Sequence, residues 1–306
     1  EIETEQMIVS PFRMYAAAHV RRSALRTGLA ESFALPDPST RDCSVAQNFR
    51  SLCRSGAHAE HTAGAAPGFV QCNLVALPKV HALDFMLFAL RNPRSCPLLA
   101  VTEPGDPHPV IAPSADLRTD VPKYAVWRHG VLDAHVHDAS EVWSDDMVGF
   151  LLGCSFTWED RLAEAGLCPR HIEQGTNVPM YRTTLPNAPA GPFGGDLVVS
   201  MRPYRPEQIA AVAELTGRYP GAHGAPVHWG DAEDALGIGE SALARPDFGE
   251  AVEIRPCEVP VFWACGVTPQ TALMAAQLPL AVTHAPGYMF VTDLVDDDLR
   301  VADERY

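Results

Sequence analysis

The sequence lacks the short motifs by which several large enzyme classes are recognised. It contains no GxGxxG, P-loop, HExxH, GxSxG or EF-hand signature. Each of these motifs encodes a defined arrangement, such as a loop that cradles phosphates or a helix that binds zinc. Nucleotide hydrolysis, zincin chemistry and serine-hydrolase chemistry therefore have no support in the sequence.

Long hydrophobic runs are also missing. The apolar stretches are shorter than the roughly 20 residues that span a bilayer. The first twenty residues carry Glu1, Glu3 and Glu5 and no long apolar core. We therefore expect neither a membrane segment nor a secretory leader, and we predict a cytoplasmic protein.

Paired cysteines are absent as well. The eight cysteines form no CxxC pair, and no Cys/His group has the spacing of a zinc site. A chain of 306 residues is long enough to fold without a disulfide framework. We expect reduced, mostly buried thiols, and no cofactor is evident from the residues alone.

Basic residues are in the minority, with 23 Lys and Arg against 38 Asp and Glu, for a formal net charge of −15. Such a surface repels phosphate backbones and anionic lipids, so we expect neither nucleic acid nor membrane as a partner. A pocket that is locally cationic can still bind a small carboxylate, because distant surface charges are screened.

Segments typical of helices and strands alternate along most of the chain, which favours an α/β fold with some α+β character. We predict two intertwined α/β domains with mixed sheets, since residues 103–122 are rich in Pro and Asp and mark a domain crossing. The larger domain comprises 1–112 plus 204–306. The smaller, inserted α+β domain comprises 113–203.

Local patterns predict individual elements. A hairpin is expected around His129-Gly130, and Thr157 with Asp160 resembles a capping box. Helices are expected at 10–34, 44–56, 81–91, 143–152, 157–165 and 207–217. Strands are expected at 69–77, 96–101, 124–129, 131–135, 169–184, 196–203, 252–254, 259–264, 279–282 and 288–292.

The most informative segment is a strand followed by a glycine turn and a helix. Cys265-Gly266-Val267 forms the turn, and Thr268-Pro269 is expected to provide the N-cap and first residue of the helix 269–277. A helix N-terminus suits a carboxylate or an oxyanion. Two alternatives remain: Thr268 only caps the helix while Cys265 only packs, or Cys265 is a nucleophile with a lowered pKa.

Histidine and arginine supply further candidates. His284 lies in a loop, where it can transfer protons near neutral pH, although a solvated histidine is the alternative. Arg118, Arg182 and Arg202 are candidate clamps, because a guanidinium binds a carboxylate bidentately. Each of these arginines is equally suited to pair with one of the many acidic residues.

Short motifs recur in order between about residues 50 and 294. They are TAG at 62–64, PGFVQCN at 67–73, RNP at 91–93, CP at 96–97, DLRTD at 116–120, GCSF at 153–156, RHI at 170–172, NVPMYRT at 177–183, VSMRP at 199–203, HGAPVH at 223–228, EVPVFWACGVTPQ at 258–270, THAPG at 283–287 and TD at 292–293. This ordered set resembles the hydro-lyase family that includes D-glutamate cyclases.

The resemblance implies a two-part α/β protein and a reaction that eliminates water. For D-glutamate cyclases, that reaction closes the amino acid to 5-oxo-D-proline. Members with this activity are associated with a divalent metal, especially Mn²⁺, although the metal ligands here are unknown. The sequence departs from the family pattern at Tyr288, where histidine is usual, and at Cys72, where alanine is common.

A mechanism follows as a hypothesis. An arginine (Arg118, Arg182 or Arg202) would anchor the α-carboxylate of the substrate, and the turn from Gly266 to Thr268 would hold the distal carboxylate and stabilise its oxyanion. His284 or Glu258 would move protons, and Cys265 completes the catalytic candidates. The remaining predicted substrate contacts are Asn73, Asn177, Tyr181 and Tyr288.

Three other interpretations stay open. The same scaffold is suited to a dehydratase or lyase that acts on another small carboxylate in specialised metabolism. A hydrolase or transferase would depend on Cys265 as nucleophile, and a carboxylate-binding protein would bind without turnover. Assembly into a homo-oligomer is also left open.

Overall fold

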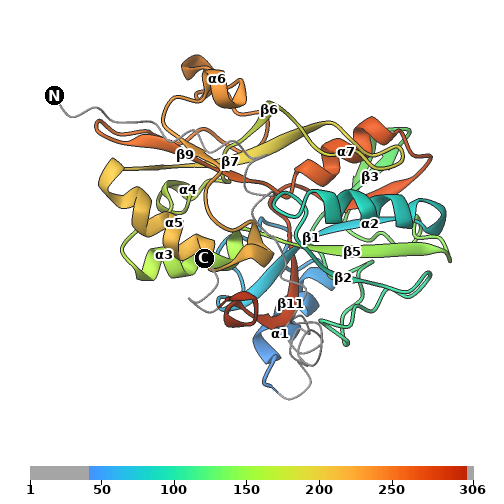
Figure 1. Cartoon of the computed structure of the whole chain (residues 1–306). Coiled ribbons are helices and arrows are strands. Elements are labelled where there is room, and N and C mark those ends of the chain that lie inside the picture. Colours follow the sequence, from blue (N-terminus) through green and yellow to red (C-terminus); the bar gives the residue numbers. More distant parts are fainter. Residues whose placement is uncertain (1–40, 302–306) are drawn as a thin grey trace, which may run out of the picture. The chain divides into compact units, whose positions relative to one another are not determined.

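The computed structural model describes residues 41–301 (Figure 1); the helix predicted at 10–34 lies outside this range. The helices are α1 (Ser44–Arg54), α2 (Ala82–Arg91), α3 (Phe156–Glu164), α4 (Arg170–Gln174), α5 (Ile209–Gly217), α6 (Glu233–Leu236) and α7 (Thr268–Ala276). The strands are β1 (Phe69–Pro78), β2 (Leu98–Val101), β3 (Tyr124–Arg128), β4 (Val131–Val136), β5 (Met147–Gly153), β6 (Met180–Pro186), β7 (Asp196–Tyr204), β8 (His228–Trp229), β9 (Val259–Ala264), β10 (Ala281–His284) and β11 (Phe290–Val295). Short 3₁₀ helices lie at Lys79–His81, Pro206–Gln208, Pro220–Ala222, Glu240–Ala242 and Asp296–Leu299.

Two sheets organise these elements, and the predicted α/β class is confirmed. One sheet has the strand order β2-β5-β1-β10-β3-β4, with β11 also on β1, and the other has the order β6-β7-β9-β8. The pairings are antiparallel, which gives the fold its α+β character. Segment 113–203 contributes β3, β4 and β5 to the first sheet and β6 and β7 to the second; the domain division stays a prediction.

Strand β1 is the centre of the seven-stranded sheet, and its residues from Val70 to Leu77 are buried. One edge pairs with β5. The other edge is shared, because β11 pairs with the first half of β1 and β10 pairs with the second half. The chain between β10 and β11 therefore leaves the sheet opposite Asn73 and Leu74.

One face of this sheet packs against α2 and α7 (Figure 1). Phe85 of α2 makes edge-to-face contacts with Phe150 and Phe193, at centroid distances of 4.8 and 5.2 Å. Such aromatic pairs add to the stabilisation that their buried area provides. Helix α1 packs on β11 through a separate cluster that contains Phe49 and Val291.

The four-stranded sheet carries side chains of different kinds on its two faces, as strand alternation requires. Val199 and Met201 of β7 pack with Leu236 of α6. The alternate residues Ser200 and Arg202 face the other side, where polar contacts link β7 to α3. Helices α3, α4 and α5 lie on this second side of the sheet, and α6 lies on the first (Figure 1).

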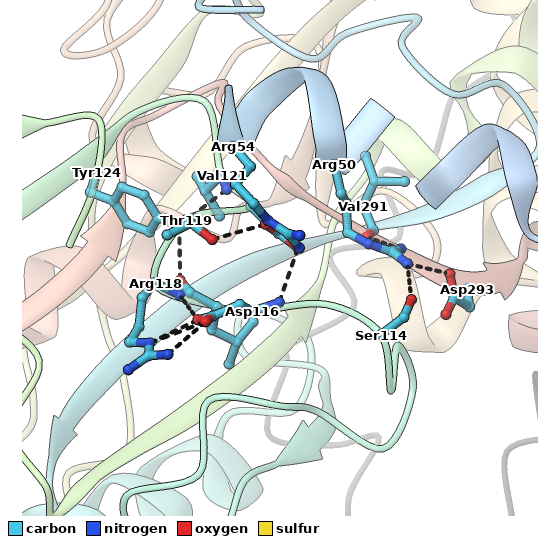
Figure 2. Close-up of polar contacts among 12 residues, drawn as sticks. Arg50, Arg54, Ser114, Asp116, Arg118, Thr119, Val121, Tyr124, Val291 and Asp293 are labelled. Carbon is cyan, nitrogen blue, oxygen red and sulfur yellow. Dashed lines mark hydrogen bonds and ion pairs between the residues drawn. The ribbon is translucent and has the colours of Figure 1, made fainter. Parts of the chain in front are cut away.

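Ion pairs fasten α1 and the loop 114–120 to the sheet (Figure 2). Arg54 binds both carboxylate oxygens of the fully buried Asp120, each at 2.7 Å. Arg50 donates to Asp293, to Ser114 and to the Val291 carbonyl at 2.8, 3.2 and 3.0 Å. The predicted clamp Arg118 donates to both oxygens of Asp116 in the same loop.

The hairpin predicted around His129-Gly130 is confirmed by β3 and β4. Both turn residues have positive φ, 49° for His129 and 76° for Gly130, as a tight turn between antiparallel strands requires. No residue other than glycine fits at position 130, because a Cβ there would lie 2.2 Å from the Met274 carbonyl oxygen.

The helix predicted at 143–152 is wrong, because this segment contains β5. Its residues Met147 to Gly153 are all buried between β1 and β2. A short apolar run fits a buried strand as well as a buried helix, so periodicity alone does not separate them. The close contacts of Gly149 with Leu117 and of Gly153 with Gly221 suit a packed strand.

Three other predictions need correction. The strand predicted at 169–184 is only partly correct. The first part of this segment forms the helix α4, which ends at Gly175 with a φ of 65°. Only Met180–Pro186 is a strand. Residues 252–254 are not in a strand. The Thr157/Asp160 capping box does not form, since α3 has Ser155 as its N-cap residue and no side-chain cap bond.

Within residues 41–301, none of the helices has the length and apolar character needed to cross a membrane.

Removing the Asp120 carboxylate should destabilise the fold strongly. Asp120→Ala leaves the Asp116 N–H and the Arg54 guanidinium without their acceptor, and we expect a loss of about 3 kcal/mol in the free energy of unfolding. Asp133→Ala, which removes an exposed ion pair with Arg128, should cost less than about 1 kcal/mol. Urea unfolding of both variants tests this, and equal losses would contradict it.

Candidate functional site

The two sheets meet where the end of β9 contacts the middle of β1. Gly266 lies so close to Asn73 that an added Cβ would be 2.1 Å from the Asn73 Nδ2. That nitrogen donates to the Gly153 carbonyl at 2.9 Å, so Asn73 also contacts the end of β5. The predicted residues Asn73, Cys265 and Gly266 are thus brought together.

A hydrophobic cluster fills this meeting point, and we name it the junction cluster. Its buried members are Cys154, Phe156, Val178, Met180, Val198, Val267 and Met289, and its partly buried members are Ala63, Phe248 and Cys265. These residues come from seven separate segments of the chain. Most of the segments contain motifs that were noted in the sequence.

Two helices begin at the junction cluster, α3 after Cys154 and α7 after Cys265. Burial raises the pKa of Cys265 to about 11, against the lowering effect of the backbone N–H groups of Val267 and Gly266 that point at its sulfur. Burial likewise raises the pKa of Cys154 to about 12, against the N–H of Phe156. Both thiols therefore stay protonated at neutral pH. The positive ends of both helix dipoles lie beside them.

The loop between β10 and β11 closes one side of the cluster. Gly287 has a φ of 88°, and a Cβ there would lie 2.7 Å from the Asn177 Nδ2. The Thr62 N–H donates to the Gly287 carbonyl at 2.8 Å, and the Met289 N–H donates to the Thr62 Oγ1 at 2.9 Å. The predicted residue Asn177 therefore lies beside Gly287 at the same junction.

Thr268 and His284 lie near the junction but make structural contacts. The Thr268 hydroxyl accepts the Val198 N–H at 3.0 Å, and α7 starts at Thr268 with Val267 as its N-cap residue, one position earlier than predicted. His284 Nδ1 accepts the Leu74 N–H at 3.1 Å, which replaces a ladder bond where the edge of β1 is left open. Burial lowers the pKa of His284 to about 4, so its imidazole is neutral.

A buried ionic network stands behind the junction cluster. Arg202 is fully buried, and its Nε donates to Glu159 at 3.0 Å, while two further nitrogens donate to Ser200 and Ser155 at 3.0 and 2.9 Å. The guanidinium also lies over the rings of Trp158 and Trp263 at 4.7 and 5.3 Å. All of these partners of Arg202 lie inside the protein, so Arg202 is not a free clamp for a substrate carboxylate.

Glu159 connects this network to a histidine. Its carboxylate lies 3.3 Å from the Nε2 of His171, which is itself buried. Burial alone would raise the pKa of Glu159, but His171 and Arg202 outweigh it, and the pKa is lowered. Glu159 is therefore an anion between two nitrogen groups.

Four predicted residues are engaged elsewhere. Arg118 binds Asp116, and Arg182 is exposed beside Asp247 and the Phe248 ring. The remaining two are Tyr181, whose hydroxyl donates to the Leu243 carbonyl on the α6 side of the sheet, and Glu258. Both Glu258 oxygens are used, one by the Arg170 side chain at 2.7 Å and the other by the Arg255 N–H at 2.8 Å.

Tyr288 follows Gly287 directly and is half-buried. Its ring lies below the ammonium group of Lys123, which is 5.3 Å from the ring centroid. Tyr288 therefore brings a phenol and a neighbouring cation to the loop at the junction.

Two hollows on the surface are less suited than the junction cluster to binding a carboxylate. One, with a volume of about 470 Å³, is lined by Asp160, Glu164 and Asp296 together with Arg161; its acidic wall repels anions. Burial raises the pKa of Asp296 there to about 7. The other hollow is lined mainly by apolar residues, among them Trp229 and Ile209.

The sequence did not single out Glu159 and His171 as functional candidates. His171 lies in the RHI motif at 170–172, which was noted without a role, and Glu159 lies in a predicted helix. Their direct contact joins positions twelve residues apart, and Arg202 on β7 binds the same carboxylate. No local spacing signals such an arrangement, because it depends on how α3 and α4 pack on the sheet.

The match to a known protein family covers most of the segments that form the junction cluster. The sequence profile of the family described as D-glutamate cyclase matches residues 148–293. A crystal structure of a nitrogen repressor-like protein from Methanococcus jannaschii aligns with 80% of this chain and 96% of its own length, at 8% identity and a TM-score of 0.31. At that level the likeness supports no inference about fold or function.

Three bacterial relatives named "Putative hydro-lyase" are much more similar. The protein from Paracoccus denitrificans is 55% identical over 87% of this chain and 99% of its own length. The proteins from Pseudomonas syringae pv. syringae and Rubrobacter xylanophilus are each 56% identical, over 77% and 82% of this chain and 89% and 96% of their own lengths. With such identity over most of both chains, the protein belongs to the D-glutamate cyclase family of hydro-lyases.

Proposed function

We propose that the protein is a cyclase of the lyase class that converts D-glutamate into 5-oxo-D-proline and water. The observation that carries this proposal is the junction of β1 with the α7 turn, where two helix N-termini and the amides of Asn73 and Asn177 gather around one cluster. A small dicarboxylate suits this environment, because helix N-termini attract anions. The relatives' names and the family profile support the reaction type.

The substrate would be held by dipoles more than by arginine. The N-terminal turn of α7 would attract the distal carboxylate and stabilise the oxyanion of the tetrahedral intermediate. The N-terminus of α3 would attract the α-carboxylate, and Arg202 behind it would add positive potential. Asn73 and Asn177 would orient the substrate.

The chemistry balances without an oxidant or a second substrate. The amine nitrogen forms a bond to the distal carboxyl carbon, and one C–O bond of that carboxyl group breaks. Of the three ammonium hydrogens, one stays on the lactam nitrogen and two leave with the oxygen as water. The protein must therefore move two protons from nitrogen to oxygen.

The divalent metal that the family resemblance implies has no matching ligand set in the part of the chain that the structure describes. Residues 41–301 contain no group of three or more His, Cys, Asp or Glu side chains that could hold a metal ion. No step is therefore assigned to a metal, and the manganese requirement stays a prediction for the assay below.

A second function is favoured by Tyr288. The pair of Tyr288 with Lys123 places a phenol and a cation where the family pattern has histidine. The same scaffold would then act as a lyase or dehydratase on another small carboxylate. A carboxylate-binding protein without turnover would give thermal stabilisation by the ligand and no product.

Direct assay tests the reaction. Purified protein incubated with D-glutamate, L-glutamate or 5-oxo-D-proline, with Mn²⁺ or with chelator, should interconvert only the D compounds, as measured by chiral chromatography. Equal activity with chelator would remove the metal requirement. No conversion by folded protein in any arm would refute the D-glutamate assignment and favour another carboxylate.

Gly266→Ala should impair catalysis because the new methyl group displaces Asn73. A displacement of about 1 Å at an active site can cost about 100-fold in rate, so we expect at least that loss in kcat/KM. Gly194→Ala is the matched control, since its nearest neighbouring atom is 3.8 Å away. The control should retain its rate within about threefold, and circular dichroism should show both variants folded.

Cys265→Ser tests the nucleophile interpretation. The raised pKa of the thiol leaves little thiolate at neutral pH, so we expect the variant to keep its rate within about threefold. Loss of turnover by more than about 100-fold, with a trapped acyl-enzyme in the wild type by mass spectrometry, would instead establish covalent catalysis.

A further inference from the structure

Several buried polar atoms without a hydrogen-bond partner belong to segments that also contribute side chains to the junction cluster. Among residues 41–301 they include Thr157 Oγ1, His171 Nδ1, Thr176 Oγ1 and Asn177 Oδ1. Thr157 follows Phe156 of the cluster, and Thr176 and Asn177 precede Val178. A buried polar atom left without a partner is costly, so each of these atoms marks a position where a polar ligand or water would complete a hydrogen bond.

His171 is the residue of this group that can move protons. Its side chain is 1% exposed, and its ring stacks on Phe156 with the centroids 6.5 Å apart. The ring therefore contacts the junction cluster directly. The Thr176 N–H donates to the His171 carbonyl at 2.9 Å, which fixes the end of α4 beside Asn177.

The two ring nitrogens of His171 have different environments. Nε2 lies 3.3 and 3.2 Å from the two oxygens of Glu159, whereas Nδ1 has no partner. An ionised carboxylate only accepts hydrogen bonds, so Nε2 must carry the hydrogen of the neutral ring. In the neutral ring, Nδ1 would then present a lone pair. A base oriented by a carboxylate and presenting its other nitrogen is a recurrent catalytic arrangement.

Arg202 keeps Glu159 in place for this role. Glu159 is bound by Arg202 through Nε, and Arg202 is itself held by Ser155 and Ser200. Glu159 and Arg202 are thus positioning residues, and neither needs to touch the substrate.

We propose that His171 is the general base of the cyclisation and that its Nδ1 takes the amine proton; this deepens the proposed function and rests on it. His171 Nδ1 accepts one ammonium proton, and the neutral amine then attacks the distal carboxyl carbon. The imidazolium returns that proton to a carboxyl oxygen. A second proton follows the same route from the attached nitrogen, so the oxygen leaves as water and His171 ends neutral.

A substrate would have to enter past the members of the cluster that are only partly buried. Ala63, Phe248 and Cys265 are those members. A label on Cys265 would therefore block the route even though the thiol takes no part in the reaction. Burial of His171 also keeps bulk water away from the transferred protons.

Substitution of His171 tests the assignment. His171→Gln keeps a donor for Glu159 and removes the base, so kcat for D-glutamate should fall by about 10²–10⁴-fold with KM changed less than about threefold. Glu159→Gln should likewise lower kcat while leaving KM nearly unchanged. Imidazole added to His171→Ala should restore part of the rate.

His223→Asn is the matched control. His223 is also buried, and its Nδ1 contacts the Arg94 carbonyl at 2.7 Å, a bond that the Asn amide can replace at this positive φ. The control should keep kcat within about threefold. Retention of kcat by His171→Gln, or a loss that imidazole does not restore, would overturn the proposal.

A measurement on the wild type separates this proposal from the D-glutamate assignment. The ¹⁵N spectrum of histidine-labelled protein, assigned with His171→Gln, should show the Nε2–H tautomer. The Nδ1 signal should shift when glutarate, succinate or 5-oxo-D-proline is added, even if glutamate is not converted. An Nδ1–H tautomer, or no shift with any of the three, means that the unpartnered atoms hold only water, and the base assignment fails.

Discussion

The fold depends on a contact that only glycine permits. Gly266 lies against Asn73, the residue at the centre of β1 and beside the end of β5. This single approach brings the four-stranded sheet, through β9, onto the middle of the seven-stranded sheet. It also sets where α7 begins. A side chain at this position would displace Asn73 and shift the segments that surround the junction cluster.

The buried charges of Arg202 and Glu159 do not lie at the contact between Gly266 and Asn73. Arg202 lies over two tryptophan rings and is paired with Glu159, so its charge is held in place by protein groups. Such a buried pair gives little net stability but a defined geometry. The junction itself presents neutral groups, namely amides, thiols with raised pKa and helix N-termini. An anion that enters is thus met by dipoles that need not reorganise.

The sequence predicted what is local and missed what is tertiary. The strands at 69–77 and 259–264, the His129-Gly130 hairpin and the Cys265-Gly266 turn were predicted because apolar runs end at turn residues. The segment 143–152 was mispredicted because its apolar run is too short to show a period. Residue type could not distinguish an arginine that meets a substrate from Arg118, which meets its own loop. The Glu159–His171 contact depends on packing across three elements.

The position of β1 governs the order in which this chain can fold. β1 pairs with residues 147–153 and with two strands between 281 and 295 and, among residues 41–301, with no strand close to it in sequence. Contacts of such separation are slow to form, because a long loop must close first. During synthesis the strand at 69–78 therefore leaves the ribosome some two hundred residues before its second edge is covered. Until then one edge of β1 is unpaired and prone to aggregation. We therefore expect the chain to need a chaperone during this interval.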